Sequence, residues 1–402
     1  LGDVYKRQAS YGILGNQLLT ASSWSGNTKY YPYIPFMASG TAGNWLFVDG
    51  EKSLYINPAG LVSSDLTWEK ASTFNIGLDF TMLNQRLDFS FDWYQRTTSD
   101  MLVKVEYPEV LGTTAPPANK AELRTRGWEV SVKWNDRIGN DFSYDLGFIL
   151  SDSQAEITKY ENPSGTLSDY YVGQKIGEIW GYETEGFYQS DTDVQNHADQ
   201  SKLGANWAPG DIMYKDLDGN KKINNGSNTL DDHGDLKVIG NTTPRYQYGI
   251  TANMSYKNVY LNVFFQGIGK RDFWPSSQPF WPVATQYYNT QKWFVTDSWS
   301  EDNRDAYFAR PIARETKNQQ KQTKYLQDAS YCRLKNLTVG YDFPKSWLSF
   351  LHVAKAGVYF SAENLFEFTN VKGAYDPEAA GKNGTMVYPF QRTYSFGLNV
   401  TF

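Results

Sequence analysis

The chain has 402 residues, of which 16% are aromatic, and it contains 33 glycines, a mixture that favours strands and turns over helices. Its formal net charge of −6 argues against nucleic acid as a main partner. The single cysteine, Cys332, excludes an internal disulfide framework and a cysteine-based zinc site, and the three histidines are scattered and suggest no metal triad.

The first residues look artificial. Residues 3–8 read DVYKRQ and resemble the translation of an adapter used to prepare sequencing libraries. We therefore expect residues 1–8 to be a non-native segment, and the protein's own sequence to begin near Ala9 with its N-terminal part missing. No run of 18 apolar residues follows, so the sequence predicts no transmembrane helix.

From residue 66 onwards, apolar residues alternate with polar ones along a series of short segments. A strand turns successive side chains to opposite sides, so each segment predicts a strand with one apolar and one polar face. With a first strand near 9–17, about ten strands are expected. The other segments with this pattern are 74–80, 87–93, 128–134, 142–148, 246–252, 259–265, 337–343, 358–362 and 394–402.

The connections between these segments alternate in length. This wiring is typical of an up-and-down antiparallel barrel, and outer-membrane barrels have short turns on one rim and long loops on the other. Short turns are expected at 83–85, 135–140, 257–258 and 344–354, an intermediate one at 104–118, and long connections at 156–244, 269–328 and 367–387.

The polar faces indicate which side meets water. Bulky tryptophans and phenylalanines from every strand would not fit the narrow lumen of a soluble barrel, whereas a lipid-facing band about 25 Å tall accepts them. We therefore predict an all-β fold, a partial antiparallel transmembrane β-barrel; a soluble β-sandwich is the alternative. Charged residues opposite the aromatic faces are Asp79, Asp88, Asp92, Glu129, Lys133 and Asp145.

One loop has the composition of a calcium site. Its segment DLDGNKKIN places oxygen ligands at alternate positions, as loops that wrap calcium do. It departs from an EF-hand, because Lys221 and Ser227 replace the expected glycine and acid. Asp231 and Asp232 could add ligands, and an Asx-rich turn without metal is the alternative. The predicted calcium ligands are Asp216, Asp218, Asn220 and Asn224.

The loop between residues 273 and 299 is rich in aromatic residues. Flat rings can stack on sugars or clamp a peptide. Alternatively, most of these rings pack the loop on itself or against a partner. The residues singled out as candidate ligand contacts are Trp274, Trp281, Tyr287, Tyr288 and Trp293.

No residue of the sequence stands out as catalytic. His233 has no nucleophile placed beside it, and the glutamates on predicted strands are scattered rather than paired, as glycoside hydrolysis would require. The sequence therefore predicts a protein that is not an enzyme.

Eight stretches, in order along the chain, carry a family resemblance. They resemble the C-terminal part of a SusC/RagA-type TonB-dependent outer-membrane transporter, and they cover nearly the whole chain after residue 8. The stretches are ASYGILGNQ at 9–17, DLTWEKASTFNIGLDFTMLNQRLDFSFDWYQRTTSDML at 65–102, NKAELRTRGWEVSV at 119–132, GEIWGYETEGFYQSDTDV at 177–194, PGDIMYKDLDGNKKIN at 209–224, VIGNTTPRYQYGI at 238–250, YLQDASYCRLKNLTVGYDFP at 325–344 and YFSAENLFEFT at 359–369.

The resemblance implies more than the residues show. Such transporters have a barrel of about 22 strands, so residues 9–402 would be its C-terminal portion, without the plug and the TonB box. They lie in the outer membrane of Gram-negative bacteria and import oligosaccharides or peptides with a SusD-like lid lipoprotein and the TonB complex. The terminal Phe402 resembles the signal that the barrel-assembly machinery reads. No cofactor beyond the possible calcium is implied.

Two other functions remain open at this stage. The first is a soluble or surface-attached β-rich module that binds glycans, which would need no detergent for extraction. The second is a surface hydrolase on a β-sandwich scaffold, which the missing carboxylate pair disfavours.

Overall fold

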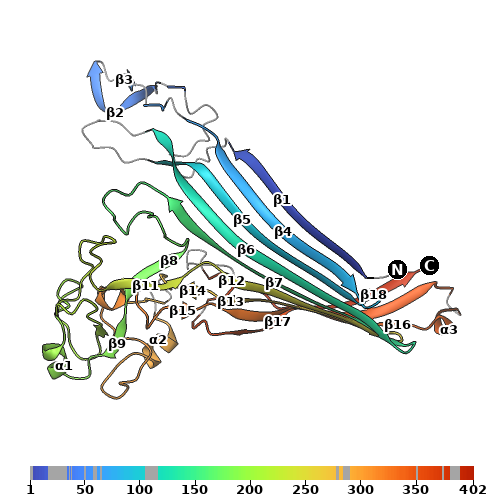
Figure 1. The fold of residues 1–402 in the computed structure, drawn as a ribbon. Helices are drawn as coiled ribbons and strands as arrows, with labels where there is room; N and C mark the ends of the chain where they lie inside the picture. The colour runs from blue at the N-terminus through green and yellow to red at the C-terminus, as the bar shows by residue number, and fades with distance from the viewer. Residues whose placement is uncertain are drawn as a thin grey trace.

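The computed structural model describes residues 3–16, 34–35, 37, 39–48, 51–57, 61–63, 66–104, 116–277, 280–283, 290–349, 352–373, 375–380 and 390–402. Ten of its strands form one antiparallel sheet, shown in Figure 1. In spatial order these strands are β1 (Val4–Asn16), β4 (Glu69–Met82), β5 (Leu87–Lys104), β6 (Pro117–Ile138), β7 (Phe142–Lys159), β12 (Arg245–Tyr256), β13 (Val259–Lys270), β16 (Tyr331–Asp342), β17 (Lys355–Thr369) and β18 (Thr393–Thr401).

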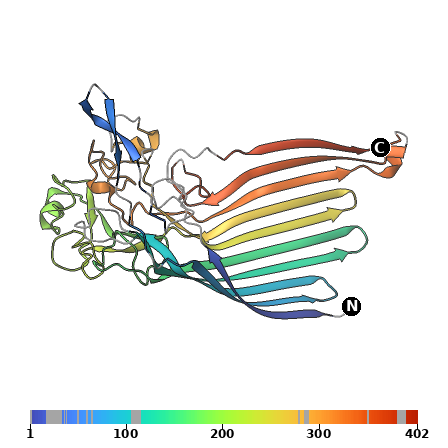
Figure 2. The same cartoon turned by 90° about the horizontal axis from the view of Figure 1, so that it is seen from above.

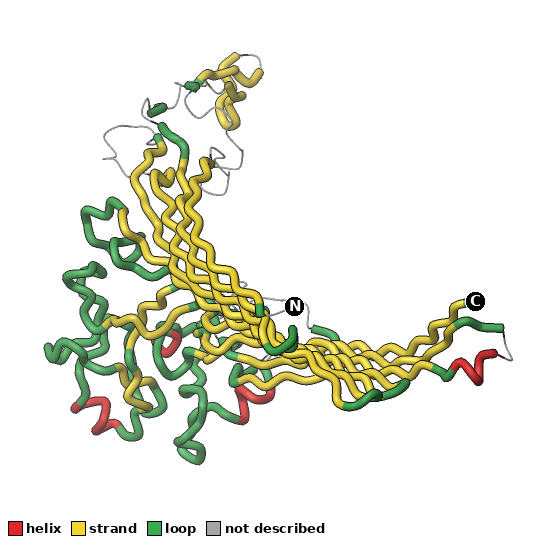
Figure 3. The backbone as a smooth tube through the Cα atoms, turned by 45° about the vertical axis from the view of Figure 1, so that its right-hand side comes forward, coloured by secondary structure: helices red, strands yellow, loops and turns green. Residues whose placement is uncertain are grey.

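The sheet confirms the predicted up-and-down wiring. Each of its strands pairs with the next one along the chain within the sheet, and the hairpin turns at 83–86, 139–141 and 257–258 are tight. In Figure 2 these turns lie at the same end of the sheet as both termini, while the long connections gather at the opposite end. Figures 1 and 3 show a bent, open sheet with β1 and β18 as its edges.

The strands are longer than their alternating segments predicted. β6 has 22 residues, and at about 3.4 Å per residue it extends roughly 75 Å, three times the height of a lipid-facing band. Beyond that band both faces of a strand meet water, so the alternation of apolar and polar residues fades although the pairing continues. The prediction that residues 135–138 belong to a turn is wrong. These residues continue β6, and only residues 139–141 form the turn.

The two faces of the sheet differ in chemistry, as predicted. On one face Leu78, Phe91 and Val130 are neighbours on successive strands. On the other face Lys133 forms an ion pair of 3.1 Å with Asp145 on the next strand. The other sheets in the described residues have two strands each, so no second large sheet covers the apolar face. The β-sandwich alternative is therefore wrong.

Tyrosines of the polar face lie over glycines of the neighbouring strand. Tyr94 is paired with Gly127, and a Cβ added to that glycine would come within 2.5 Å of the tyrosine ring. Tyr359 is paired in the same way with Gly397. Glycine weakens a strand because it has no side chain to pack, and an aromatic ring from the partner strand compensates for this.

The remaining elements belong to the connections. The paired short strands are β2 (Ser39–Val48) with β3 (Glu51–Ile56), β8 (Glu178–Tyr182) with β11 (Leu236–Asn241), β9 (Thr184–Phe187) with β10 (Ile212–Tyr214), and β14 (Asp272–Phe273) with β15 (Gln327–Asp328). The helices are α1 (Asp191–Asn196), α2 (Lys292–Thr296), α3 (Lys345–Leu348) and the 3₁₀ helix η3 (Lys317–Gln319). None of the helices in the described residues has the length and apolar character needed to cross a membrane.

Residues 4–8 of the predicted non-native segment belong to β1. Residues 4–8 pair with residues 77–81 of β4, and Arg7 lies opposite Leu78 on the apolar face. Pairing through the backbone does not depend on the origin of the side chains. The division into residues 1–8 and 9–402 therefore stays a prediction.

A charge on the apolar face tests the assignment of that face to lipid. We expect Phe91→Arg to lower the free energy of unfolding by up to about 2–4 kcal/mol in lipid vesicles, because a guanidinium that faces the hydrocarbon loses its hydration. The matched control is Ser90→Arg, which places the same group on the polar face opposite Asp79 and Ser131. Urea titration of both variants in vesicles measures the difference. Equal stabilities would contradict the assignment.

Candidate ligand-binding loops

Two of the long connections fold together at one end of the sheet (Figure 1). We call residues 160–244 the first long loop and residues 271–330 the second long loop. Their apolar side chains share one core, which we call the loop core. The buried members of the loop core are Tyr182, Phe187, Ile212, Tyr214 and Ile223 from the first long loop, and Phe280, Trp281, Phe294, Trp299, Ala306, Phe308, Ala309 and Tyr325 from the second.

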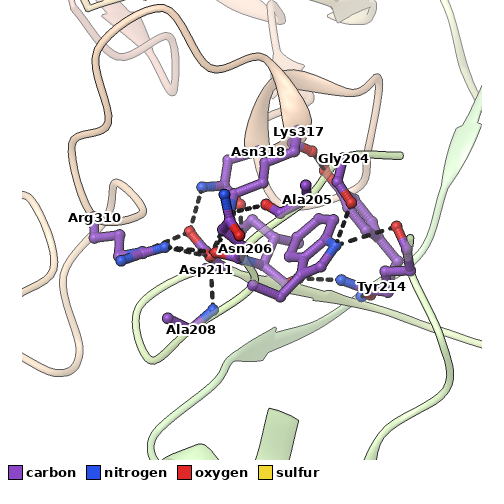
Figure 4. A network of polar contacts seen from close by, with 12 residues as sticks. Gly204, Ala205, Asn206, Ala208, Asp211, Tyr214, Arg310, Lys317 and Asn318 are labelled. Carbon is purple, nitrogen blue, oxygen red and sulfur yellow. Dashed lines mark hydrogen bonds and ion pairs between the residues drawn. The ribbon is translucent and has the colours of Figure 1, made fainter. Parts of the chain in front are cut away.

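A buried ionic network joins the two loops beside this core (Figure 4). Asp211 of the first loop is fully buried, and its carboxylate accepts hydrogen bonds from Arg310 at 2.8 and 2.9 Å and from Asn318 at 2.9 Å. The Lys317 ammonium, whose side chain is only 1% exposed, lies 3.0 Å from the same carboxylate and also donates to the carbonyl of Ala205. The network holds the two loops in one relative position.

We call residues 370–392 the third long loop, and Arg333 ties its described part to the sheet. This β16 residue is 1% exposed, and its guanidinium lies 2.6 Å from both Asp376 and Glu378. Lys335 adds an ion pair of 3.0 Å to Glu378. Because Tyr375 forms a hydrogen bond with Ser277 of the second loop, the third loop is also joined to the other two.

Two predicted ligand contacts pack within the loops. Trp281 is 8% exposed in the loop core, and its indole N–H donates to the carbonyl of Pro275 at 2.7 Å. Trp293 stacks on Tyr307 with ring centroids 5.9 Å apart. Both tryptophans therefore stabilise the loops, which is the alternative given above for most of these aromatic residues.

The other predicted contacts are placed differently. Trp274 is half-buried at the margin of the loop core, with its ring 6.1 Å from that of Trp281. Tyr287 and Tyr288 lie outside the described residues. Among the described candidates, Trp274 keeps the position best suited to ligand contact, which stays a prediction.

The predicted calcium loop brings three carboxylates together. Ligand oxygens of Asp216, Asp218 and Asp235 all lie within 4.8 Å of one another, a donor set that suits a hard cation such as calcium. The same carboxylates accept hydrogen bonds from backbone amides of the loop, as do the side-chain oxygens of Asn220 and Asn224. The bonds of Asp218, Asn220 and Asn224 to the amide two residues on are Asx turns, which need no metal, so calcium at Asp216, Asp218, Asn220 and Asn224 stays a prediction.

Most of the chain matches one known family. Residues 23–365 match the model of the family described as TonB dependent receptor-like, beta-barrel. The chain belongs to this family. It is an outer-membrane protein, as predicted, and the predicted resemblance to SusC/RagA-type receptors is confirmed.

Relatives of this TonB-dependent receptor chain cover almost all of it. It is 28% identical to TonB-dependent receptor P3 of Formosa agariphila, over 99% of this chain and 39% of that protein. It is 27% identical to TonB-dependent receptor SusC of Bacteroides thetaiotaomicron, over 85% of this chain and 32% of that protein. The chain thus spans about two fifths or less of the length of these relatives. Both relatives are named as receptors, and the prediction that the chain is not an enzyme is confirmed.

Solved structures show the same fold. The structure of the RagAB peptide transporter superposes with a TM-score of 0.72 over 99% of this chain and 41% of that chain, at 23% identity. The RagAB peptide importer in its open-open state gives 0.72 at 24% identity, over 99% and 40% of the two chains. At this identity the likeness establishes the fold of the receptor chain alone.

The last residue of the receptor chain is exposed. Phe402 follows β18 at the edge of the sheet and is 92% exposed. On the same face, Phe396 is 84% exposed and packs with its ring 5.1 Å from that of Phe360 on β17. Recognition of Phe402 by the barrel-assembly machinery stays a prediction.

Removing the Asp211 carboxylate tests whether the ionic network holds the loops together. Asp211→Ala leaves the buried Lys317 ammonium without its counter-charge, and we expect a loss of about 3–5 kcal/mol in loop stability. Asp302→Ala, an exposed change in the second loop, should alter stability by less than about 0.5 kcal/mol. Chymotrypsin cleavage of the aromatic loops and their near-ultraviolet circular dichroism report the difference. Wild-type resistance in the Asp211 variant would contradict this role.

Calorimetry tests the calcium prediction. We expect calcium to bind the protein with a dissociation constant on the order of 10⁻⁴ to 10⁻³ M, as in extracellular calcium modules. Asp218→Asn should weaken binding, because it removes the charge of one of the three clustered carboxylates, whereas Asp302→Asn, an exposed change in the second long loop, should not. If calcium releases no heat, the loop is an Asx-rich turn without metal.

Proposed function

We propose that this chain supplies C-terminal strands and ligand-contacting loops to an outer-membrane importer of oligosaccharides that is energised through TonB. The observation that carries the proposal is the joining of the long loops into one ordered body at a single end of the sheet, opposite the tight turns. An importer has to capture its ligand on one side of the membrane, and a body with fixed loops provides the surface for this.

Completion of the barrel is part of the proposal. β1 and β18 each have one hydrogen-bonded neighbour in the sheet, and unpaired backbone groups at an edge are very unfavourable in lipid. Because the chain spans only about two fifths of the length of its relatives, we propose that further strands of the same receptor pair with these edges. The plug and the TonB-contacting segment would belong to that other part.

The partner and the ligand class rest on the family. We propose a SusD-like surface lipoprotein as a lid over the loops, because the chain resembles SusC/RagA-type receptors. Oligosaccharides are favoured over peptides because half-buried tryptophans such as Trp180 and Trp274 lie on the loops, and aromatic rings suit sugar faces. Peptides are the second candidate, because the RagAB proteins of the same fold are named as peptide transporters.

Uptake by living cells tests this function. We expect deletion of the gene to abolish uptake of a fluorescent oligosaccharide from a panel of plant and algal glycans, and complementation to restore it. A protonophore should stop uptake in complemented cells, because TonB draws on the proton gradient. Detergent should be required to extract the protein.

The outcomes separate the alternatives. If the deletion strain loses growth on peptides while it keeps all glycan uptake, the ligand class is peptide. If the protein is extracted without detergent and uptake is unchanged, the importer proposal is wrong.

A further inference from the structure

A recess of about 530 Å³ opens on the surface of the loops. Its walls come from segments that are far apart in the sequence: the end of β8, the region around residue 202, the predicted calcium loop, and the start and end of the second long loop. The lining residues that matter for recognition are Trp180, Lys202, Asn225, Trp274, Gln320 and Lys321.

The recess is positively charged. Its described lining contains Lys202 and Lys321, both exposed, and no aspartate or glutamate. Among the described residues, neither lysine forms an ion pair within 4.0 Å. Asp199 lies near Lys202, but both oxygens of the Asp199 carboxylate already accept hydrogen bonds from Ser201. These bonds lower the pKa of Asp199, and the charges of Lys222 and Lys202 lower it further. Two ammonium groups therefore remain available to a ligand.

Aromatic rings and free amides complete the lining. Trp180 and Trp274 are half-buried, so part of each ring faces the recess. The indole N–H of Trp180 donates to the Tyr171 hydroxyl, and its ring packs 5.5 Å from that of His233, so a ligand in the recess would meet the part of the ring that these partners leave exposed. The side-chain amides of Asn225 and Gln320 make no hydrogen bond to any other described residue.

The walls of the recess are held in place before a ligand arrives. The backbone amide of Tyr182 donates to the carbonyl of Lys321 at 2.8 Å, and that of Thr323 donates to the carbonyl of Tyr182 at 3.1 Å. These bonds connect β8 of the first long loop to the second long loop, beside the Asp211 network. Little ordering of the backbone is then needed on binding, which favours affinity.

We propose that this recess binds a negatively charged sugar unit, such as a uronic acid, of the imported oligosaccharide. The two lysines bind its carboxylate, the amides of Asn225 and Gln320 bind its hydroxyls, and the tryptophan rings pack against its C–H face. The proposal rests on the function proposed above and adds a charge selectivity to it. An acidic peptide would satisfy the lysines but presents no sugar ring with hydroxyls to the rings and amides.

Binding measurements on the whole receptor, purified from outer membranes in detergent, test the proposal. The probes are tri-galacturonate, the neutral galactotriose and a tetrapeptide with two aspartates. We expect tri-galacturonate to bind at least about tenfold more tightly than galactotriose, since charge-assisted hydrogen bonds are roughly twice as strong as neutral ones. Added salt should reduce that preference.

The variants locate the selectivity in the recess. Lys202→Gln with Lys321→Gln should remove the preference for tri-galacturonate and leave binding of galactotriose unchanged. Lys175→Gln with Lys292→Gln is the matched control, because it removes two other exposed loop lysines that do not line the recess. Trp274→Ala should weaken binding of both trisaccharides.

Each other outcome overturns the proposal in a recognisable way. If the two trisaccharides bind equally, or if the preference for tri-galacturonate survives the Lys202 and Lys321 substitutions, the recess does not select for negative charge. Oligosaccharide import is tested separately by the uptake experiment. Tighter binding of the tetrapeptide than of tri-galacturonate overturns the sugar assignment and redirects the importer to peptides. Failure of tri-galacturonate to bind at millimolar concentration rejects the recess as its site.

Discussion

Backbone hydrogen bonding in lipid is the constraint on which the rest of this structure depends. Inside a membrane every N–H and C=O must find a partner within the protein, and an antiparallel sheet with strands paired on both sides satisfies this requirement. Eight strands of the sheet have neighbours on both sides, and only β1 and β18 do not. Once pairing fixes the strands, side chains alternate between two faces, so rings such as Phe91 gather on one side and charged groups such as Lys133 and Asp145 on the other. The apolar side of the sheet is therefore not a protein core; lipid takes that place.

The loops bury their apolar side chains instead of exposing them, because the loops lie in water. There, apolar residues are driven inward, and the loop core buries Ile212, Tyr214 and Tyr325 completely. A hydrophobic core alone is tolerant of sliding, whereas a carboxylate that binds Arg310, Lys317 and Asn318 is satisfied in one arrangement only. Asp211 thus adds directional contacts between two loops that already share one core. Arg333, which binds Asp376 and Glu378, extends the same principle from the loops to the strands.

The sequence predicted the sheet much better than the loops, for a physical reason. A strand in lipid repeats one local rule over many residues, so segments such as 74–80 and 87–93 identify strands, faces and turns without any long-range information. The contacts of the loops are not local. Asp211 and Arg310 are separated by 99 positions, and neither stands out among the many charged residues around it. The predicted calcium loop shows both situations: the spacing along the chain pointed to Asp216 and Asp218, whereas Asp235, which lies beside them in the structure, comes from beyond the next turn and does not belong to that spacing.

This division also explains where specificity can reside in a receptor of this kind. The sheet offers a repetitive surface, and changes along it alter stability in lipid more than recognition. The loops combine positions from distant parts of the chain, so a recess between them can gather Lys202, Asn225 and Lys321 although no short segment contains more than one of them. Such a recess keeps its shape only if the segments that form it are held apart at fixed distances, and the backbone bonds between Tyr182, Lys321 and Thr323 do this. The backbone bonds and the buried ionic network that join the loops therefore fix the positions of the exposed charges that line the recess.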